Sequence, residues 1–196
     1  VEAVKPYFER FVGELPDVES LAQVSEDRLM KLWEGLGYYN RARNLKRAAV
    51  QVEEEYGGQL PADYEKLKAL PGVGSYTAGA VASIAYGLPV PAVDGNVLRV
   101  ISRLFLWEED ILKQSSKKKM EEALKAVMPK GRAGAFNQAL MELGAVVCVP
   151  NGPARCGECP LAFLCRARIE GRIGEFPHKG EKKARRIEEK TVFVIQ

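Results

Sequence analysis

The chain has 196 residues and a mass of 21.7 kDa. Of these residues, 46% are apolar and 28% are charged, as in a globular protein of one ordinary domain or two small ones. The sequence has no apolar stretch near the roughly 18 residues of a membrane span and no basic-then-apolar start, so we expect neither membrane insertion nor secretion. A net charge of +3 does not by itself indicate a nucleic-acid binder.

Apolar residues at helical spacing recur along the chain and predict an all-α fold. The first predicted helix is capped by Ser25 and ends at Gly37, and the next ends at Gly57-Gly58. The expected buried faces are Leu29, Leu32, Trp33 and Leu36; Leu45, Ala48, Ala49, Val52 and Tyr56; Val97, Val100, Ile101 and Leu104; Met120, Ala123, Leu124 and Val127 behind a Ser115-Ser116 cap; and Phe136, Ala139, Leu140, Leu143 and Val147.

Both ends of the sequence look cut. The chain begins at Val1 without a methionine, and it ends in a β-branched run from Thr191 to Gln196 that predicts a strand. A lone strand has no partner for its backbone groups, so we interpret residues 191–196 as the first strand of a missing C-terminal domain. Residues 176–190 then form a basic linker, in which His178, the only histidine, is expected to be solvated.

The string Leu70-Pro-Gly-Val-Gly-Ser-Tyr-Thr-Ala78 lies between two helical segments. Gly72 and Gly74 allow a hairpin whose backbone N-H groups are unobstructed, and the following helix directs the positive end of its dipole to the same point. This geometry suits one phosphate oxygen, whereas a plain tight turn between packed helices would need only the two glycines. The full string resembles the helix-hairpin-helix element of DNA repair glycosylases.

Asp94 precedes the helix that carries Val97 to Leu104, where it can cap the helix and remain ionised. Capping alone explains an aspartate at this position. It leaves unexplained the distance of Asp94 from the preceding helix, whose small residues permit a close backbone approach: Ala78, Gly79, Ala80, Ala82, Ser83 and Ala85. The combination looks like a glycosylase active site, in which an anionic aspartate faces the sugar.

All four cysteines, Cys148, Cys156, Cys159 and Cys165, lie within eighteen residues, which favours a metal site over a disulfide framework. Zinc is more often held by two Cys-x2-Cys pairs, and only one such pair occurs here. Iron-sulfur clusters accept four unevenly spaced thiolates, so a [4Fe-4S] cluster is the preferred interpretation and zinc the alternative. Nearby arginines suit a loop that faces a phosphate backbone.

Taken together, the chain resembles the adenine-specific mismatch DNA glycosylases of the MutY type, within the endonuclease III superfamily. The strings that carry the resemblance are Pro6-Tyr-Phe-Glu-Arg-Phe11, Leu32-Trp-Glu-Gly-Leu-Gly-Tyr-Tyr39, Arg41-Ala-Arg-Asn44, the hairpin, Val93-Asp-Gly-Asn-Val97, Phe136-Asn-Gln138, Leu143-Gly-Ala145 and the cysteine loop. The loop departs from the family by one extra residue between its first two cysteines, which a loop absorbs easily.

The resemblance implies a domain organisation. Residues 1–90 would form a helical barrel subdomain with the hairpin, lacking its N-terminal helices, and residues 91–175 an iron-sulfur cluster subdomain. The implied activity is base-excision repair by a single protein chain that removes adenine from double-stranded DNA containing a mismatched adenine, opposite 8-oxoguanine or guanine. Such an enzyme would work inside the cell, in the cytoplasm near the nucleoid if its source is bacterial.

The resemblance also implies roles for individual residues. Asp94 would stabilise positive charge on the sugar, and Tyr76 would stand near that sugar, in a slot where relatives that cut the backbone carry lysine. Gly72, Val73, Gly74, Ser75 and Thr77 would hold the DNA strand. Three further residues have a functional and a structural interpretation. Asn96 either orients Asp94 or starts a helix, and Gln138 either pairs with adenine or supports a helix flank. Tyr38 either wedges beside the lesion or packs between helices.

In the family a catalytic glutamate lies on a helix upstream of the part that matches Val1 to Phe11, and neither Glu2 nor Glu9 falls at its position. We therefore expect the chain as printed to bind duplex DNA weakly and to release adenine at no useful rate. Tyrosine in the slot of Tyr76 also occurs in thymine-mismatch glycosylases, which are the first alternative. A non-catalytic DNA-binding iron-sulfur module is the second.

Overall fold

The computed structural model describes residues 4–180, so the predicted strand at 191–196 and most of the predicted linker lie outside the described residues. The α-helices, in chain order, are α1 (Lys5–Glu14), α2 (Val18–Gln23), α3 (Glu26–Trp33), α4 (Asn40–Tyr56), α5 (Tyr64–Lys68), α6 (Ser75–Tyr86), α7 (Gly95–Phe105), α8 (Gln114–Val127), α9 (Ala133–Glu142) and α10 (Arg166–Ile169). A π-helical turn, η2 (Leu143–Val147), continues α9, and a 3-10 turn, η3 (Ile173–Glu175), follows α10. Residues 4–180 contain no strand, which confirms the all-α fold, and none of their helices is long and apolar enough to cross a membrane.

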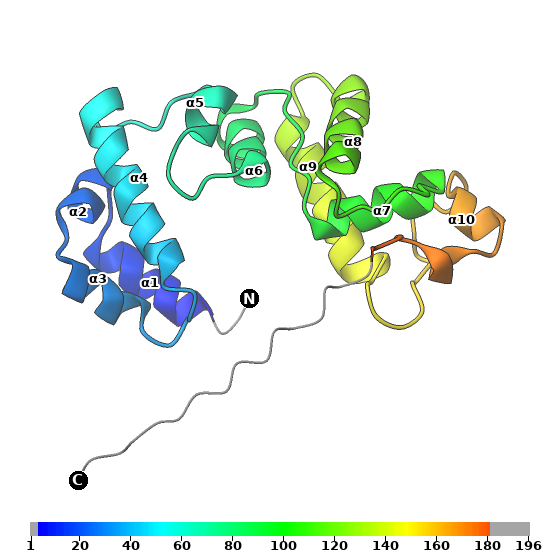
Figure 1. The fold of residues 1–196 in the computed structure, drawn as a ribbon, viewed down its shortest axis with the longest axis horizontal. Helices are drawn as coiled ribbons and strands as arrows, with labels where there is room; N and C mark the ends of the chain where they lie inside the picture. Colours follow the sequence, from blue (N-terminus) through cyan, green and yellow to red (C-terminus); the bar gives the residue numbers. More distant parts are fainter. Residues whose placement is uncertain (1–3, 181–196) are drawn as a thin grey trace, which may run out of the picture.

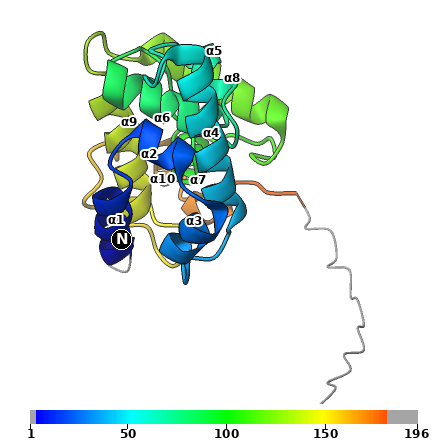
Figure 2. The same cartoon turned by 90° about the vertical axis from the view of Figure 1, so that its left-hand side faces the viewer.

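The helices form an arch (Figure 1). Helices α1 to α4 stand at one end, α7 to α10 stand at the other, and α5 and α6 connect the two ends across the top of the view. Turning the molecule by 90° shows α1, α2 and α3 in front of the rest, with α4 running alongside them (Figure 2). The hairpin between α5 and α6 and the start of α7 therefore belong to the middle and the far side of the arch.

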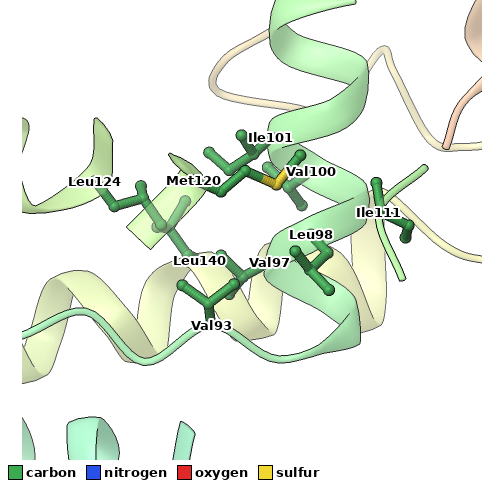
Figure 3. Close-up of a cluster of buried hydrophobic side chains, with 9 residues drawn as sticks. All are labelled: Val93, Val97, Leu98, Val100, Ile101, Ile111, Met120, Leu124 and Leu140. Carbon is green, nitrogen blue, oxygen red and sulfur yellow. The ribbon is translucent and has the colours of Figure 1, made fainter. Parts of the chain in front are cut away.

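Three apolar clusters hold the arch together. One joins α1, α3 and α4 around Leu29, Leu32 and Ala42, and a second joins α4, α5 and α6 around Val52 and Leu67. The third lies among α7, α8 and α9, where side chains of α7 face Met120, Leu124 and Leu140 (Figure 3). The clusters change membership near residue 90, but α6 and α9 pack against each other across that point, so the division at 90/91 stays a prediction.

The predicted helix ends are partly confirmed. Ser25 caps α3 by accepting a hydrogen bond from the Arg28 N-H, and Gly57 ends α4 in the left-handed conformation. Helix α3 stops at Trp33, before the predicted Gly37. The reason is local: Gly35 has φ +95° and Gly37 has φ +69°, and the Trp33 indole donates to the Gly37 carbonyl, so the chain turns back on the helix end.

Some of the predicted buried faces are wrong. Four of the expected side chains are exposed: Leu45, Ala123, Val127 and Ala139. Each lies at the edge of the apolar stripe of its helix, and the centre of that stripe makes the contact with the neighbouring helix. Helix α8 begins at Gln114 behind Lys113, with no side-chain cap. Ser116 is instead a buried residue of the first turn whose hydroxyl donates to Glu109.

Small residues bring three backbone segments together, as the composition of α6 predicts at Gly79. A methyl group on Gly79 would overlap the carbonyl oxygen of Pro91, in the segment that leads to α7. One on Gly134 of α9 would lie 2.8 Å from the Ser83 carbonyl oxygen, and one on Gly144 of η2 would collide with Asn96. Helix α9 therefore rests directly on α6, and its π-helical extension rests on the start of α7.

The first residues of the predicted linker pack on the helical part. Phe176 is 2% exposed, and the Arg103 guanidinium donates to its carbonyl. His178 is only partly solvated, with its side chain 40% exposed: its ring lies edge-on against Phe176 at 4.7 Å between centroids, and its Nε2 is 3.3 Å from a Glu108 carboxylate oxygen. The boundary between the cluster subdomain and the linker remains a prediction, since residues 181–190 lie outside the described part.

We predict that Gly79→Ala lowers the free energy of unfolding by about 2 kcal/mol, because the added methyl group meets a backbone carbonyl that cannot move aside cheaply. Gly13→Ala is the matched control, since that glycine also lies in a helix but has open space around it and should gain or lose well under about 1 kcal/mol. Urea titration followed by circular dichroism measures both. Equal stability of the two variants would contradict the close approach.

Candidate functional site

The hairpin between α5 and α6 presents free backbone donors. Gly72 has φ +76° and lies against Asn44 of α4, while Val73 turns its side chain into the apolar cluster of α4 to α6. Gly74 is the N-cap of α6, has no side chain to cap the helix, and faces open space. The N-H groups at the start of this twelve-residue helix are therefore available to an anion, in the place that the sequence assigned to Ser75 and Thr77.

Asp94 is the N-cap of α7, as predicted. Its Oδ1 accepts a hydrogen bond of 2.8 Å from the Val97 N-H, and its Oδ2 accepts one of 2.8 Å from the Asn96 amide. The two donors hold the carboxylate in one orientation at the positive end of the α7 dipole. Asn96 thus contacts Asp94 directly, which supports the orienting role over that of a simple helix start.

A buried arginine connects this aspartate to the cysteine loop. Arg99 is 7% exposed, and its guanidinium donates to the Asn96 amide oxygen at 2.8 Å, the Gly144 carbonyl at 2.6 Å and the Cys148 carbonyl at 2.7 Å. Burial lowers the pKa of this guanidinium below its ordinary value. The sequence reasoning missed Arg99, although a charged residue on the apolar stripe of α7 was a visible signal.

Arg103, one turn further along α7, contacts the cysteine loop itself. Its guanidinium donates to the Cys148 sulfur at 3.3 Å and to the Val149 carbonyl at 3.1 Å, and the Cys165 thiol donates to the Arg103 carbonyl at 3.5 Å. Arg103 is also buried and was also missed. The two arginines make α7 a bridge between Asp94 at its start and the first and last cysteines beside its body.

The four cysteines are free thiols that line one small cavity, together with Val147, Ala162 and Arg168. Burial raises the pKa of the Cys165 thiol, and a hydrogen bond from the Arg168 backbone acts in the opposite direction. Within residues 4–180 no three acidic, histidine or cysteine side chains are placed closely enough to hold a single metal ion.

Tyr76 is 41% exposed at the start of α6, and its hydroxyl donates to the Met141 sulfur of α9 at 3.6 Å. Gln138 is an exposed residue one turn before Met141 on α9. Residues three apart on a helix share a face, so α9 brings Gln138 to the same side as Tyr76. Met141 had no signal in the sequence beyond its helical spacing.

Tyr38 is 82% exposed and does not pack between two helices. Its φ of +47° is rare for a residue with a side chain, and the Arg41 guanidinium lies 5.6 Å from the centre of its ring. Strained and exposed aromatic residues cluster at functional sites. Tyr38 lies two residues before α4, the helix whose Asn44 touches Gly72, so Tyr38 and the hairpin are both supported by α4.

Comparison with known proteins gives the class. The sequence profile of the HhH-GPD superfamily of base excision DNA repair proteins matches residues 1–130, and the chain belongs to this family. Among curated proteins it is 42% identical over 181 residues to the adenine DNA glycosylase of Rattus norvegicus, covering 90% of this chain and 35% of that protein. It is 35% identical over 199 residues to the adenine DNA glycosylase of Buchnera aphidicola subsp. Schizaphis graminum, covering 100% of this chain and 56% of that protein.

Solved structures agree with the family. A thermostable thymine-DNA glycosylase has a TM-score of 0.77 at 31% identity, with 85% of this chain and 76% of that chain covered. An endonuclease III trapped as a covalent intermediate with DNA has a TM-score of 0.72 at 30% identity, with 86% and 77% covered. The chain therefore spans most of these smaller glycosylases but only about a third to a half of the curated adenine enzymes named above.

We predict that Arg99→Met lowers the free energy of unfolding by about 3 kcal/mol, because it leaves the buried Gly144 and Cys148 carbonyls without their donor. Arg47→Met is the control: Arg47 is an exposed residue of α4, and its loss should change stability by less than about 0.5 kcal/mol. Chemical denaturation measures both variants. A cost below about 1 kcal/mol for Arg99→Met would mean that these bonds do not hold the loop.

Proposed function

We propose that this chain carries the catalytic centre of a monofunctional glycosylase that hydrolyses the bond between adenine and deoxyribose in duplex DNA, where the adenine is mispaired with 8-oxoguanine or guanine. The observation that carries the proposal is a pair of groups on two helices that both pack against α9: a carboxylate at Asp94 that is held by two donors at the start of α7, and a phenol at Tyr76 of α6, where an amine would be a nucleophile. The curated adenine DNA glycosylases support the choice of base.

Such an enzyme must first hold a nucleotide outside the helical stack, because the glycosidic bond cannot be attacked inside the duplex. The open N-H groups at the start of α6 suit a backbone phosphate of that strand, and this contact reads no sequence. Tyr38, strained, exposed and stacked by Arg41, suits the place that the extruded base leaves. Gln138 has an amide that suits the edge of adenine.

As the glycosidic bond breaks, positive charge develops on the sugar, and the Asp94 carboxylate stabilises that charge. Asn96 and the Val97 N-H keep this carboxylate in one orientation, so it need not reorganise during the reaction. Water then adds to the sugar and loses a proton, while adenine takes up a proton as it leaves; the resemblance assigns the general acid for that protonation to the glutamate upstream of Val1. Tyr76 cannot form a Schiff base, so the DNA backbone stays uncut after the adenine has left.

The thymine-mismatch alternative is the closest competitor, since a thymine-DNA glycosylase is among the structural neighbours. The adenine reading rests on the similarity of nearly the whole chain to adenine enzymes and on the Asp-Gly-Asn string after Val93. A pure binding module would need neither the oriented carboxylate nor the phenol.

We further propose a [4Fe-4S] cluster on Cys148, Cys156, Cys159 and Cys165. A zinc ion would require all four sulfurs within about 2.3 Å of one point, whereas each iron of a cluster takes one cysteine and leaves the sulfurs farther apart. The four cysteines line one cavity and include a single Cys-x2-Cys pair, where zinc is more often held by two such pairs, and this supports the cluster. When bound, the cluster would tie the loop to α7 through Arg103, without a part in the hydrolysis.

We predict that the protein purified without oxygen is brown and contains about four iron atoms per chain, because one cluster takes one thiolate on each of four irons. Cys159→Ser should lower the iron content and the affinity for DNA together. Iron analysis and the absorption near the visible iron-sulfur bands measure this. A colourless protein with one zinc per chain would contradict the cluster.

We predict that the chain binds a duplex with a cationic pyrrolidine in place of one deoxyribose about tenfold more tightly than the same duplex with a neutral tetrahydrofuran, because Asp94 faces the charged ring. Asp94→Asn should abolish this preference and leave the affinity for the neutral duplex unchanged. Neither duplex contains a base to release, so the comparison does not depend on a general acid. Fluorescence anisotropy gives both dissociation constants.

Gly74→Leu is the matched control for that measurement. A side chain at this N-cap should cover the phosphate site and weaken both duplexes alike, with the preference for the cationic sugar retained. The assignment of Asp94 fails if Asp94→Asn keeps the preference. The assignment of the hairpin fails if Gly74→Leu binds both duplexes as well as the unchanged chain does.

A further inference from the structure

The segment Leu88–Asp94, which connects α6 to α7, has no regular secondary structure. Its own backbone bonds are few: Leu88 donates back to Ala82, and Val90 donates to Leu88 at 2.8 Å. Yet this segment ends at the catalytic carboxylate proposed above, and Pro91, Ala92 and Val93 are all buried. A buried irregular segment needs partners for its polar backbone groups from elsewhere in the fold.

Asn137 of α9 supplies those partners. It is 1% exposed, and its Oδ1 accepts a hydrogen bond of 3.1 Å from the Ala92 N-H, while its Nδ2 donates to the Val90 carbonyl at 2.9 Å. The same Nδ2 donates to the Ser83 hydroxyl of α6 at 2.8 Å. The amide orientation follows from its partners, because a backbone N-H can only donate and a carbonyl can only accept.

The pattern is the one that a neighbouring strand would make. In a sheet, a residue of the next strand donates to the carbonyl of one residue and accepts from the N-H of the residue two further along. The Asn137 carboxamide does both, to Val90 and to Ala92, around Pro91, which has no N-H of its own. The Asn137 side chain thus makes the two hydrogen bonds that a neighbouring strand would make. These bonds fix the position of the segment along its own length.

The opposite side of the segment is closed as well. Gly79 of α6 is in direct contact with the Pro91 carbonyl, where no side chain would fit. The segment is therefore held between the backbone of α6 and the carboxamide of α9, two residues before Asp94. A small slip along this direction would move the carboxylate relative to the sugar, and small misplacements of a catalytic group cost large factors in rate.

We propose that Asn137 is a positioning residue for Asp94: its carboxamide sets the position of the Val90–Ala92 backbone and so fixes where the carboxylate stands. The effect on the sugar rests on the proposed function, whereas the effect on the backbone does not. Its sequence neighbour Gln138 points to solvent, so the two adjacent amides of α9 have different roles.

The test uses the whole chain with Asn137→Leu, which keeps the size of the side chain and removes all three bonds. Ser83→Ala is the matched control, because it removes the hydroxyl partner and leaves both bonds to the segment. Hydrogen exchange followed by NMR gives the protection of the Ala92 amide. Anisotropy with the cationic and neutral sugar duplexes gives the preference that depends on Asp94.

We expect Asn137→Leu to lower the protection of Ala92 by about tenfold or more relative to the amides of α4, and to lower the preference for the cationic duplex with the neutral affinity unchanged. Ser83→Ala should leave both near the values of the unchanged chain. A merely structural asparagine would lower global stability and leave the preference of the folded fraction intact. Where Asn137→Leu does not fold, Asn137→Asp replaces the donor by a carboxylate oxygen that cannot bond the Val90 carbonyl, and it should still lower the preference.

Unchanged Ala92 protection in a folded Asn137→Leu or Asn137→Asp variant would overturn the proposal, and so would a lowered protection with the cationic preference retained. If the unchanged chain itself shows no cationic preference, the proposed function of Asp94 is wrong. In that case Ala92 protection alone decides whether Asn137 fixes the segment.

Discussion

The site depends on the hydrogen bonds of one buried guanidinium. Arg99 lies inside the protein, where an ion without partners would be costly, and its donors are used by Asn96, Gly144 and Cys148. These three acceptors come from the start of α7, from the π-helical turn after α9 and from the beginning of the cysteine loop. Because the charge must be satisfied, the three elements cannot separate without a large loss of stability, and Asp94 is oriented by the same Asn96.

The second constraint is the absence of side chains at three contacts. Gly79, Gly134 and Gly144 allow α6, α9 and η2 to approach neighbouring segments more closely than any side chain would permit. This packing places α9 against the segment before Asp94 and beside Tyr76. The proposed chemistry needs both Asp94 and Tyr76, and the two residues come from different elements. The hairpin and Tyr38 are also tied to α4, and Tyr76 lies in the first turn after the hairpin, so the proposed phosphate site and the phenol share one support.

Patterns local in sequence were the ones that the sequence could predict. The cap at Ser25, the end at Gly57, the hairpin glycines and Asp94 as the cap of α7 depend on a few adjacent residues, and the structure has them as predicted. The exposed edges of α8 and α9 depend on which helices pack against them, which periodicity does not specify. Arg99, Arg103 and Asn137 were missed for the same reason, since a polar residue on an apolar stripe reveals its role only when its distant partners are known.

The central claim is that Tyr76 and Asp94 face the sugar of one extruded nucleotide. The position of residue 76 can be tested by placing an amine there. An amine there would condense with the aldehyde of an abasic site, and borohydride would reduce the imine to a stable bond between protein and DNA. The measurement is the yield of this adduct on an abasic duplex for Tyr76→Lys, compared with Tyr86→Lys at the other end of the same helix. We predict an adduct for Tyr76→Lys alone, and no adduct, or an equal yield for both variants, would contradict the account.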